Sequence, residues 1–160
     1  MNAYVSGYLA QRRLHIEGDQ FYGTLLGYDL SGSYQQIFSS TLTAWVPLGA
    51  EGQAAAKTWL SKRRKRFSFS SYKVTPHAIC IRMRPFRCTP LQYTTLIGDL
   101  AEFLSNLGIR PDSCPVCGQP LEGDVCDIVS DGARARVHAH CFARLQQERL
   151  VREERERSLP

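Results

Sequence analysis

CPVCGQPLEGDVCDIVSDGARARVHAHC, residues 114–141, contains four of the six cysteines and two of the four histidines of this 160-residue chain. Two pairs of metal-ligating residues stand at its ends. Cys114-x2-Cys117 comes first, and His138-x2-Cys141 follows after a gap of 20 residues. Zinc is typically bound in structural sites by four thiolate or imidazole groups at tetrahedral corners. The spacing therefore predicts one zinc ion, Zn2+, bound by Cys114, Cys117, His138 and Cys141.

The residues around both pairs favour the turns that such a site needs. Pro115 fixes one backbone angle inside the first pair, and Gly118 permits the conformation that follows the second sulfur. His138 and Cys141 are three residues apart, so both can reach one metal from the same side of the first turn of a helix.

Two strand-like segments fill the gap between the pairs. We expect strands at 124–129 and 133–139, joined by a hairpin turn at 130–132, Ser-Asp-Gly. This order of knuckle, hairpin and helix, with C-x2-C and then H-x2-C, resembles the first half of a LIM domain. The resemblance covers 114–141 and implies a treble-clef zinc finger that recognises a partner protein. A LIM domain continues into a second zinc module, but no Cys or His follows here, so we expect a single-site finger.

Two further residues compete for a place among the ligands. His140 adjoins Cys141 but would point to a different side of the helix, and Cys126 lies in the hairpin. Free cysteine is often a small core residue, which is the alternative role for Cys126. Three cysteines and one histidine are typical of closed structural sites, whereas catalytic zinc keeps an open position. We therefore expect one structural zinc ion, and the sequence leaves open whether Cys126 or His140 replaces an assigned ligand.

The finger contains few large apolar residues, so its own core is small. Ordering about 30 residues costs roughly 1–2 kcal/mol per residue for the backbone alone. Zinc binding contributes on the order of 10 kcal/mol to the folding of small fingers. The first expected role of the metal is therefore to fold this segment.

The charge changes sign just before the finger. The chain has a net charge of +5, but residues 1–110 carry 13 Lys or Arg against 6 Asp or Glu, and residues 111–160 carry 7 against 9. The sequence GIRPDS, residues 108–113, supplies turn-forming residues at this point. We predict an α+β domain at 1–110, followed at 111–160 by the zinc finger and a charged C-terminal helix.

The first 110 residues alternate between strand-like and helix-like segments. The clearest helix starts with Thr89, Pro90 and Gln92, which match a capping box with proline at the first helical position. The expected elements are two short strands within 12–30, a turn at 31–33, a strand at 34–48, a helix at 51–66, strands at 67–74 and 77–84, and a helix at 90–107. This order predicts an antiparallel sheet with two packed helices.

Several classes of function find no support in the sequence. There is no run of about 18 apolar residues and no secretory signal, so a cytoplasmic location is the default expectation. No glycine-rich phosphate loop or nucleophile motif is present. Asp29, Asp99 and Glu102 are scattered, and we interpret them as surface carboxylates. We expect no enzymatic activity and no small-molecule substrate.

A basic cluster ends the helix expected at 51–66. Residues 57–66, KTWLSKRRKR, contain six cations, of which five are consecutive: Lys62, Arg63, Arg64, Lys65 and Arg66. Stabilising a helix C-terminus needs fewer cations, so we expect an anionic partner, either a membrane surface or nucleic acid. The alternative is a solvated helix end. The helix has no obvious base-reading face, which makes nucleic acid the less favoured partner.

A second resemblance covers more of the chain. FSFSSYKVTPHAICIRM, followed by a helix and the CPVCG…VHAHC finger, resembles the N-terminal soluble part of uncharacterised bacterial membrane proteins. In those proteins a charged linker helix and a membrane span follow, so the resemblance implies membrane association for a longer chain. We therefore expect a non-enzymatic, zinc-stabilised module that binds a protein or an anionic surface. The alternative is a nucleic-acid-binding regulator that uses residues 57–66.

Overall fold

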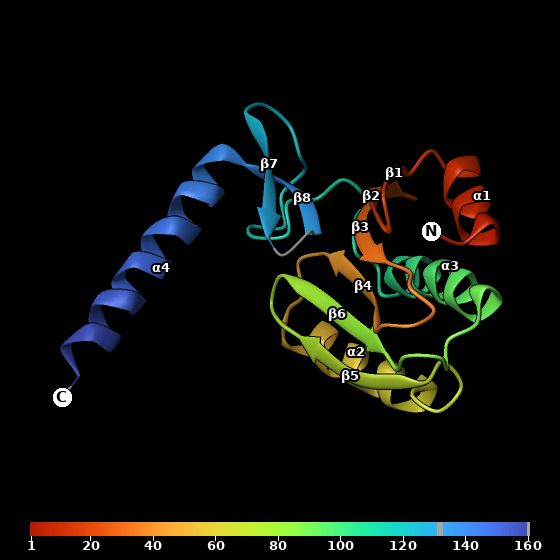
Figure 1. Ribbon diagram of the computed structural model, residues 1–160. Helices are drawn as coiled ribbons and strands as arrows, with labels where there is room; N and C mark the ends of the chain where they lie inside the picture. The colour runs from red at the N-terminus through yellow and green to blue at the C-terminus, as the bar shows by residue number, and fades with distance from the viewer. Residues whose placement is uncertain (131–132, 160) are drawn as a thin grey trace.

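The computed structural model describes residues 1–130 and 133–159 and confirms the α+β class (Figure 1). Its elements are α1 (Ala3–Gln11), β1 (His15–Glu17), β2 (Gln20–Leu25), β3 (Tyr28–Ser33), β4 (Ser40–Trp45), α2 (Ala50–Arg63), β5 (Phe69–Val74), β6 (Ala78–Met83), α3 (Pro90–Asn106), β7 (Val125–Ser130), β8 (Ala133–His138) and α4 (Ala139–Ser158). Six strands form one sheet in the order β1-β2-β3-β4-β6-β5, and every neighbouring pair is antiparallel. β7 and β8 form a separate hairpin.

Strand alternation gives the large sheet two different faces. In β4, Leu42 and Ala44 are fully buried, whereas Thr41 and Thr43 on the other face are half-buried. The apolar face joins α1, α2 and α3 in one hydrophobic core. The helices therefore cover one face of the sheet, and the other face is left polar.

Three helices pack on the sheet, which corrects the prediction of two. The additional helix, α1, buries Val5 and Leu9 in the core. The side chain of Asn2 caps its N-terminus by accepting hydrogen bonds from the backbone N–H groups of Tyr4 and Val5. α3 begins as predicted, with Thr89 and Gln92 forming a complete capping box.

Residues 31–33, expected to form a turn, lie inside β3, so this prediction is wrong. Gly32 is needed there for close packing and not for a turn, because an added Cβ would collide with the Thr41 carbonyl oxygen and the Tyr93 hydroxyl. That hydroxyl donates a hydrogen bond of 2.6 Å to the Thr41 oxygen. The neighbouring strand and the helix behind the sheet therefore meet at this glycine.

Two other predicted elements are shorter in the structure. The strand expected at 34–48 extends only over Ser40–Trp45, and the helix expected at 51–66 ends at Arg63. The strands of the predicted hairpin are present as β7 and β8. Its predicted turn at 130–132 falls mostly on residues 131–132, which lie outside the described residues.

The β7–β8 hairpin lies against β3 through a buried carboxylate. Asp29, in β3, is only 7% exposed, so the surface role expected for it is wrong. It accepts a 2.8 Å hydrogen bond from the backbone N–H of Arg136, in β8, and a 2.9 Å bond from the Nε of the same residue. Arg136 also pairs with Asp112 at 2.8 Å, and Thr24 donates to Asp29 at 3.0 Å. Arg136 thus joins the hairpin to the sheet and to the segment between α3 and β7, which contains Asp112.

A second, smaller hydrophobic cluster lies within the finger. Its buried members are Cys114, Ile128, Ala135, Val137 and Cys141, and Trp45 of the large sheet packs against it. His77 makes another contact between the two parts, because its Nδ1 lies 2.9 Å from the Pro115 carbonyl oxygen. The division into 1–110 and 111–160 stays a prediction, with two cores joined by polar contacts and by the packing of Trp45.

Replacing Asp29 by alanine should destabilise the docked arrangement. The change leaves the half-buried Arg136 guanidinium without its main acceptor, and we expect the free energy of unfolding to fall by about 1–3 kcal/mol. Denaturant unfolding would measure this. Asp124→Ala is the matched control, because that side chain is exposed and makes no hydrogen bond among the described residues. Equal stability of both variants would contradict the anchoring role.

Candidate metal centre

The two ligand pairs come together at the start of α4. Within the described residues, one atom from each of Cys114, Cys117, His138 and Cys141 lies within 4.8 Å of the other three. Three of the residues are buried and Cys117 is half-buried. The group joins the loop before β7 to the end of β8 and the first turn of α4, so it closes the finger at its base.

The first pair sits on a tight backbone turn. The Gly118 N–H donates to the Cys114 carbonyl oxygen at 2.8 Å, and the Cys114 N–H donates to the Gln119 carbonyl oxygen at 2.8 Å. Gly118 has a φ of +74°, a value that glycine adopts without strain. This turn directs both sulfur atoms of the pair to the same side.

His138 is oriented by a hydrogen bond on its far nitrogen. Its Nε2 lies 2.9 Å from the Pro120 carbonyl oxygen, and its Nδ1 lies 3.3 Å from the Cys117 sulfur. A carbonyl only accepts, so Nε2 carries the proton and the Nδ1 lone pair is free to bind a metal. His138 is the N-cap of α4, so it precedes the first helical turn in which we expected it, while Cys141 lies within that turn.

The thiols differ in acidity in the absence of metal. Burial is the largest influence on Cys114, but backbone hydrogen bonds from Cys117, His138 and Val116 outweigh it and lower its pKa to about 7. Burial raises the pKa of Cys141 to about 12, and the neighbouring Cys117 and Cys114 add to this effect. Holding three thiolates in so small a space therefore requires a cation, which is what a metal ion supplies.

The geometry and the donor types fit zinc. Zinc–sulfur bonds of about 2.3 Å and tetrahedral angles place ligand atoms about 3.5–4 Å apart. The observed limit of 4.8 Å needs only a small contraction to reach that spacing. Three sulfur atoms and one imidazole nitrogen would supply all four corners, which is the composition of a closed structural site.

The two competing residues lie outside this group. The ring of His140 stacks on that of His138 at 5.2 Å but is exposed. Cys126 faces Val137 in the hairpin register and packs against the small finger core. Their placement is the one expected of non-ligands.

The basic cluster and the finger lie at opposite ends of the sheet. The cluster leads into Phe69, which pairs with Met83, whereas the finger contacts Trp45 and His77 at the other end of β4 and β6. α2 ends at Arg63, so the five consecutive cations span the helix end and the turn that leads into β5. Lys62, Arg64, Lys65 and Arg66 are exposed, and the Arg63 guanidinium lies 4.3 Å from the Trp59 ring centre. None of these five forms an ion pair within the described part of the chain.

No protein-family model, curated protein or solved structure matches this chain, so the site is judged on its geometry. Over the described residues, none of the helices combines the length and apolar character needed to cross a bilayer.

Purified without added metal, the chain should contain one zinc per molecule. Cys117→Ala should release it, because three remaining donors leave a tetrahedral ion short of a ligand. Elemental analysis of each protein would measure the stoichiometry.

Cys126→Ala and His140→Ala are the matched controls, because each removes a zinc-binding side chain of the same type outside the group. Both should retain the metal. Loss of zinc from Cys126→Ala, or a ratio near zero or two in the unsubstituted chain, would overturn the assignment.

Removing the metal should unfold the finger and leave the larger core intact. The finger core is too small to replace the roughly 10 kcal/mol that zinc contributes to small fingers, whereas 1–110 has its own sheet and helices. Hydrogen exchange with and without a strong chelator should show loss of protection in 114–157 only. Uniform loss across the chain would mean that the two parts form one cooperative unit.

Proposed function

We propose that this chain is a zinc-stabilised binding module, in which a single structural zinc holds a LIM-like, treble-clef finger on an α+β domain. The observation that carries the proposal is the convergence of Cys114, Cys117, His138 and Cys141. Four protein donors would fill the coordination shell of a tetrahedral ion. Zinc in this role fixes a fold and takes no part in a reaction, which supports a non-enzymatic function.

The partner that we propose is anionic, and the basic cluster Lys62–Arg66 binds it. Support comes from a comparison with α4, where cations are also frequent. There, Arg144 and Arg149 pair with Glu148 and Glu153 four residues later. The cluster has no such partners among the described residues, and most of its side chains are exposed. Its charge is therefore available to an external anion.

Two anionic partners share this chemistry, a membrane surface and nucleic acid. We favour the membrane surface, in line with the resemblance to the N-terminal part of bacterial membrane proteins. A nucleic-acid-binding regulator is the alternative, and it uses the same cations.

Binding through the cluster should depend strongly on salt. For duplex DNA, each phosphate contact contributes roughly −0.9 to the slope of log K against log salt, so Lys62→Ser with Arg64→Ser should flatten it by up to about 2. For anionic vesicles each cation contributes roughly 1 kcal/mol, so the same change should weaken binding more than about tenfold. The melting temperature should change little, because exposed charges contribute little to folding.

Arg152→Ser with Arg155→Ser, on α4, is the control that removes the same charge elsewhere. It should leave binding to both ligands nearly unchanged. If the unsubstituted chain binds neither DNA nor vesicles at low salt, the cluster is a solvated helix end and the anionic-partner proposal fails.

A further inference from the structure

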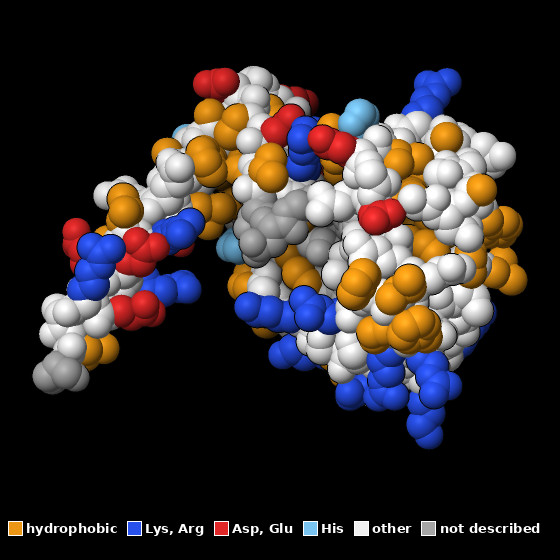
Figure 2. Space-filling model, in the orientation of Figure 1, with side chains coloured by type: hydrophobic (Ala, Val, Ile, Leu, Met, Phe, Trp, Pro, Cys, Tyr) orange, Lys and Arg blue, Asp and Glu red, His pale blue; other side chains and the backbone are white. Residues whose placement is uncertain are grey.

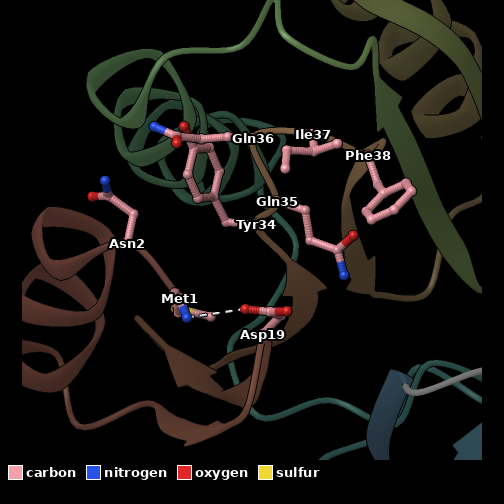
Figure 3. Close-up of a pocket in the computed structure, with 8 residues that line it drawn as sticks. All are labelled: Met1, Asn2, Asp19, Tyr34, Gln35, Gln36, Ile37 and Phe38. Carbon is pink, nitrogen blue, oxygen red and sulfur yellow. Dashed lines mark ion pairs between the residues drawn. The ribbon is translucent and has the colours of Figure 1, made fainter.

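Three large apolar side chains project into solvent beside the basic cluster. Ile37 and Phe38 lie in the β3–β4 loop and are 62% and 66% exposed, and Phe86, in the loop after β6, is 77% exposed. We call these three residues the apolar tips. Figure 3 shows Ile37 and Phe38 across a 340 Å³ pocket from Met1 and Asn2. Exposed apolar residues are common singly, but three on adjoining loops form a patch.

Backbone hydrogen bonds hold these loops together. The Phe86 N–H donates to the Gln36 carbonyl oxygen at 2.9 Å, which places the loop after β6 against the β3–β4 loop. The Arg84 N–H donates to the Ser68 carbonyl oxygen at 2.9 Å, which joins it to the turn after the basic cluster. The tips and the cluster thus share one end of the sheet.

Phe86 adopts an unfavourable backbone conformation although its side chain is mostly exposed. Its φ is +61°, a region that bulky residues rarely occupy and that Gly or Asn enters more easily. Neither burial nor backbone preference accounts for phenylalanine at this position. A residue kept there at a cost to the fold is a candidate for contact with something outside the chain.

Cations flank Phe86. Arg84 and Arg87 are exposed in the same loop, and Arg66 is joined to the start of α3 because its carbonyl oxygen accepts from Gln92 Nε2 at 2.9 Å. At the lower right of Figure 2, Lys and Arg side chains lie directly beside hydrophobic ones. Asp and Glu side chains lie mostly on other parts of this face. Asp19, the one acid among the described residues that line the pocket, is paired with the Met1 ammonium at 2.9 Å.

We propose that the apolar tips Ile37, Phe38 and Phe86 insert into the interface of an anionic lipid bilayer, while the cations at the same end of the sheet bind its headgroups. This inference rests on the proposed anionic partner and specifies its class. Apolar side chains with exposed cations beside them match a bilayer interface, which is apolar within and anionic at its surface. Duplex DNA satisfies the cations but offers no apolar layer for the tips.

The placement of the patch suits this role. The finger contacts the opposite end of the sheet, at Trp45 and His77. A bilayer bound at the tips therefore leaves the finger exposed on the far side of the molecule.

The test uses the full chain with bound zinc and vesicles of phosphatidylcholine, with and without about 30% phosphatidylserine. The unsubstituted chain should bind the anionic vesicles only. Phe86→Asn should weaken that binding at least about fivefold, and Ile37→Ser with Phe38→Ser at least about tenfold, because apolar insertion is lost. Both variants should bind duplex DNA as the unsubstituted chain does, because their cations are intact.

Phe86→Asn separates binding from folding. Asparagine tolerates the positive φ, so this variant should melt at the same temperature or higher while it loses vesicle binding. Leu150→Ser, which removes an exposed apolar side chain on α4, is the matched control and should bind normally. Phe86→Trp should retain binding, and its emission should shift to the blue with anionic vesicles.

The failures of the two proposals are distinguishable. DNA binding without vesicle binding would overturn bilayer insertion and leave the anionic-partner proposal standing. Vesicle binding that the tip variants retain in full would also overturn insertion, since charge alone would then account for it. Binding to neither ligand would overturn both.

Discussion

The convergence of four side chains that can ligate a metal is the feature around which the finger is arranged. Cys114 and Cys117 precede the β7–β8 hairpin, His138 ends it and Cys141 follows it, so one ion at this point would close the whole segment into a loop. With an ion bound there, α4 could not change its starting direction without moving a ligand. The hairpin itself is held to the sheet by the Asp29–Arg136 contact. The apolar cluster of the finger is small, so such a closure would contribute much of its order.

The finger covers part of the polar face of the large sheet. β8 lies over β3, and for that reason Asp29 and Ser31 are buried on the face that is otherwise polar. The Asp29 carboxylate accepts hydrogen bonds from both the backbone and the side chain of Arg136. The contact therefore fixes how β8 is aligned with β3 as well as how close the two strands lie. At the other end of the sheet, the basic cluster and the apolar tips remain uncovered. The finger, with its candidate metal centre, and this uncovered surface therefore lie toward different ends of the sheet.

The cluster of four candidate ligands and the capped helix could be predicted from the sequence, because both depend on local spacing. A C-x2-C pair and an H-x2-C pair carry their geometry in their spacing, and the Thr89 capping box needs only neighbouring residues. The anchor at Asp29 could not be predicted in this way, because its partner lies 107 residues away. The feature of the sequence that could have indicated this anchor is an acid placed between two apolar residues, Tyr28 and Leu30, in a strand-like segment.

Other errors arose where tertiary packing overrode local preference. Ser31, Gly32 and Ser33 have the composition of a turn, yet Gly32 lies mid-strand because Thr41 and Tyr93 leave no room for a side chain. α1 has a weak apolar face and a glycine at position 7, so its helix is stabilised mainly by packing of Val5 and Leu9. The apolar tips, scattered over two loops, become a patch only when the sheet brings those loops together.

We propose that a zinc ion with three sulfur ligands and one nitrogen ligand holds the finger. X-ray absorption at the zinc edge, measured on the purified chain, resolves the number and type of these ligands. We expect three sulfur neighbours at about 2.3 Å and one nitrogen neighbour at about 2.0 Å. A shell of four sulfur atoms, which would bring in Cys126, or a shell rich in oxygen would contradict it.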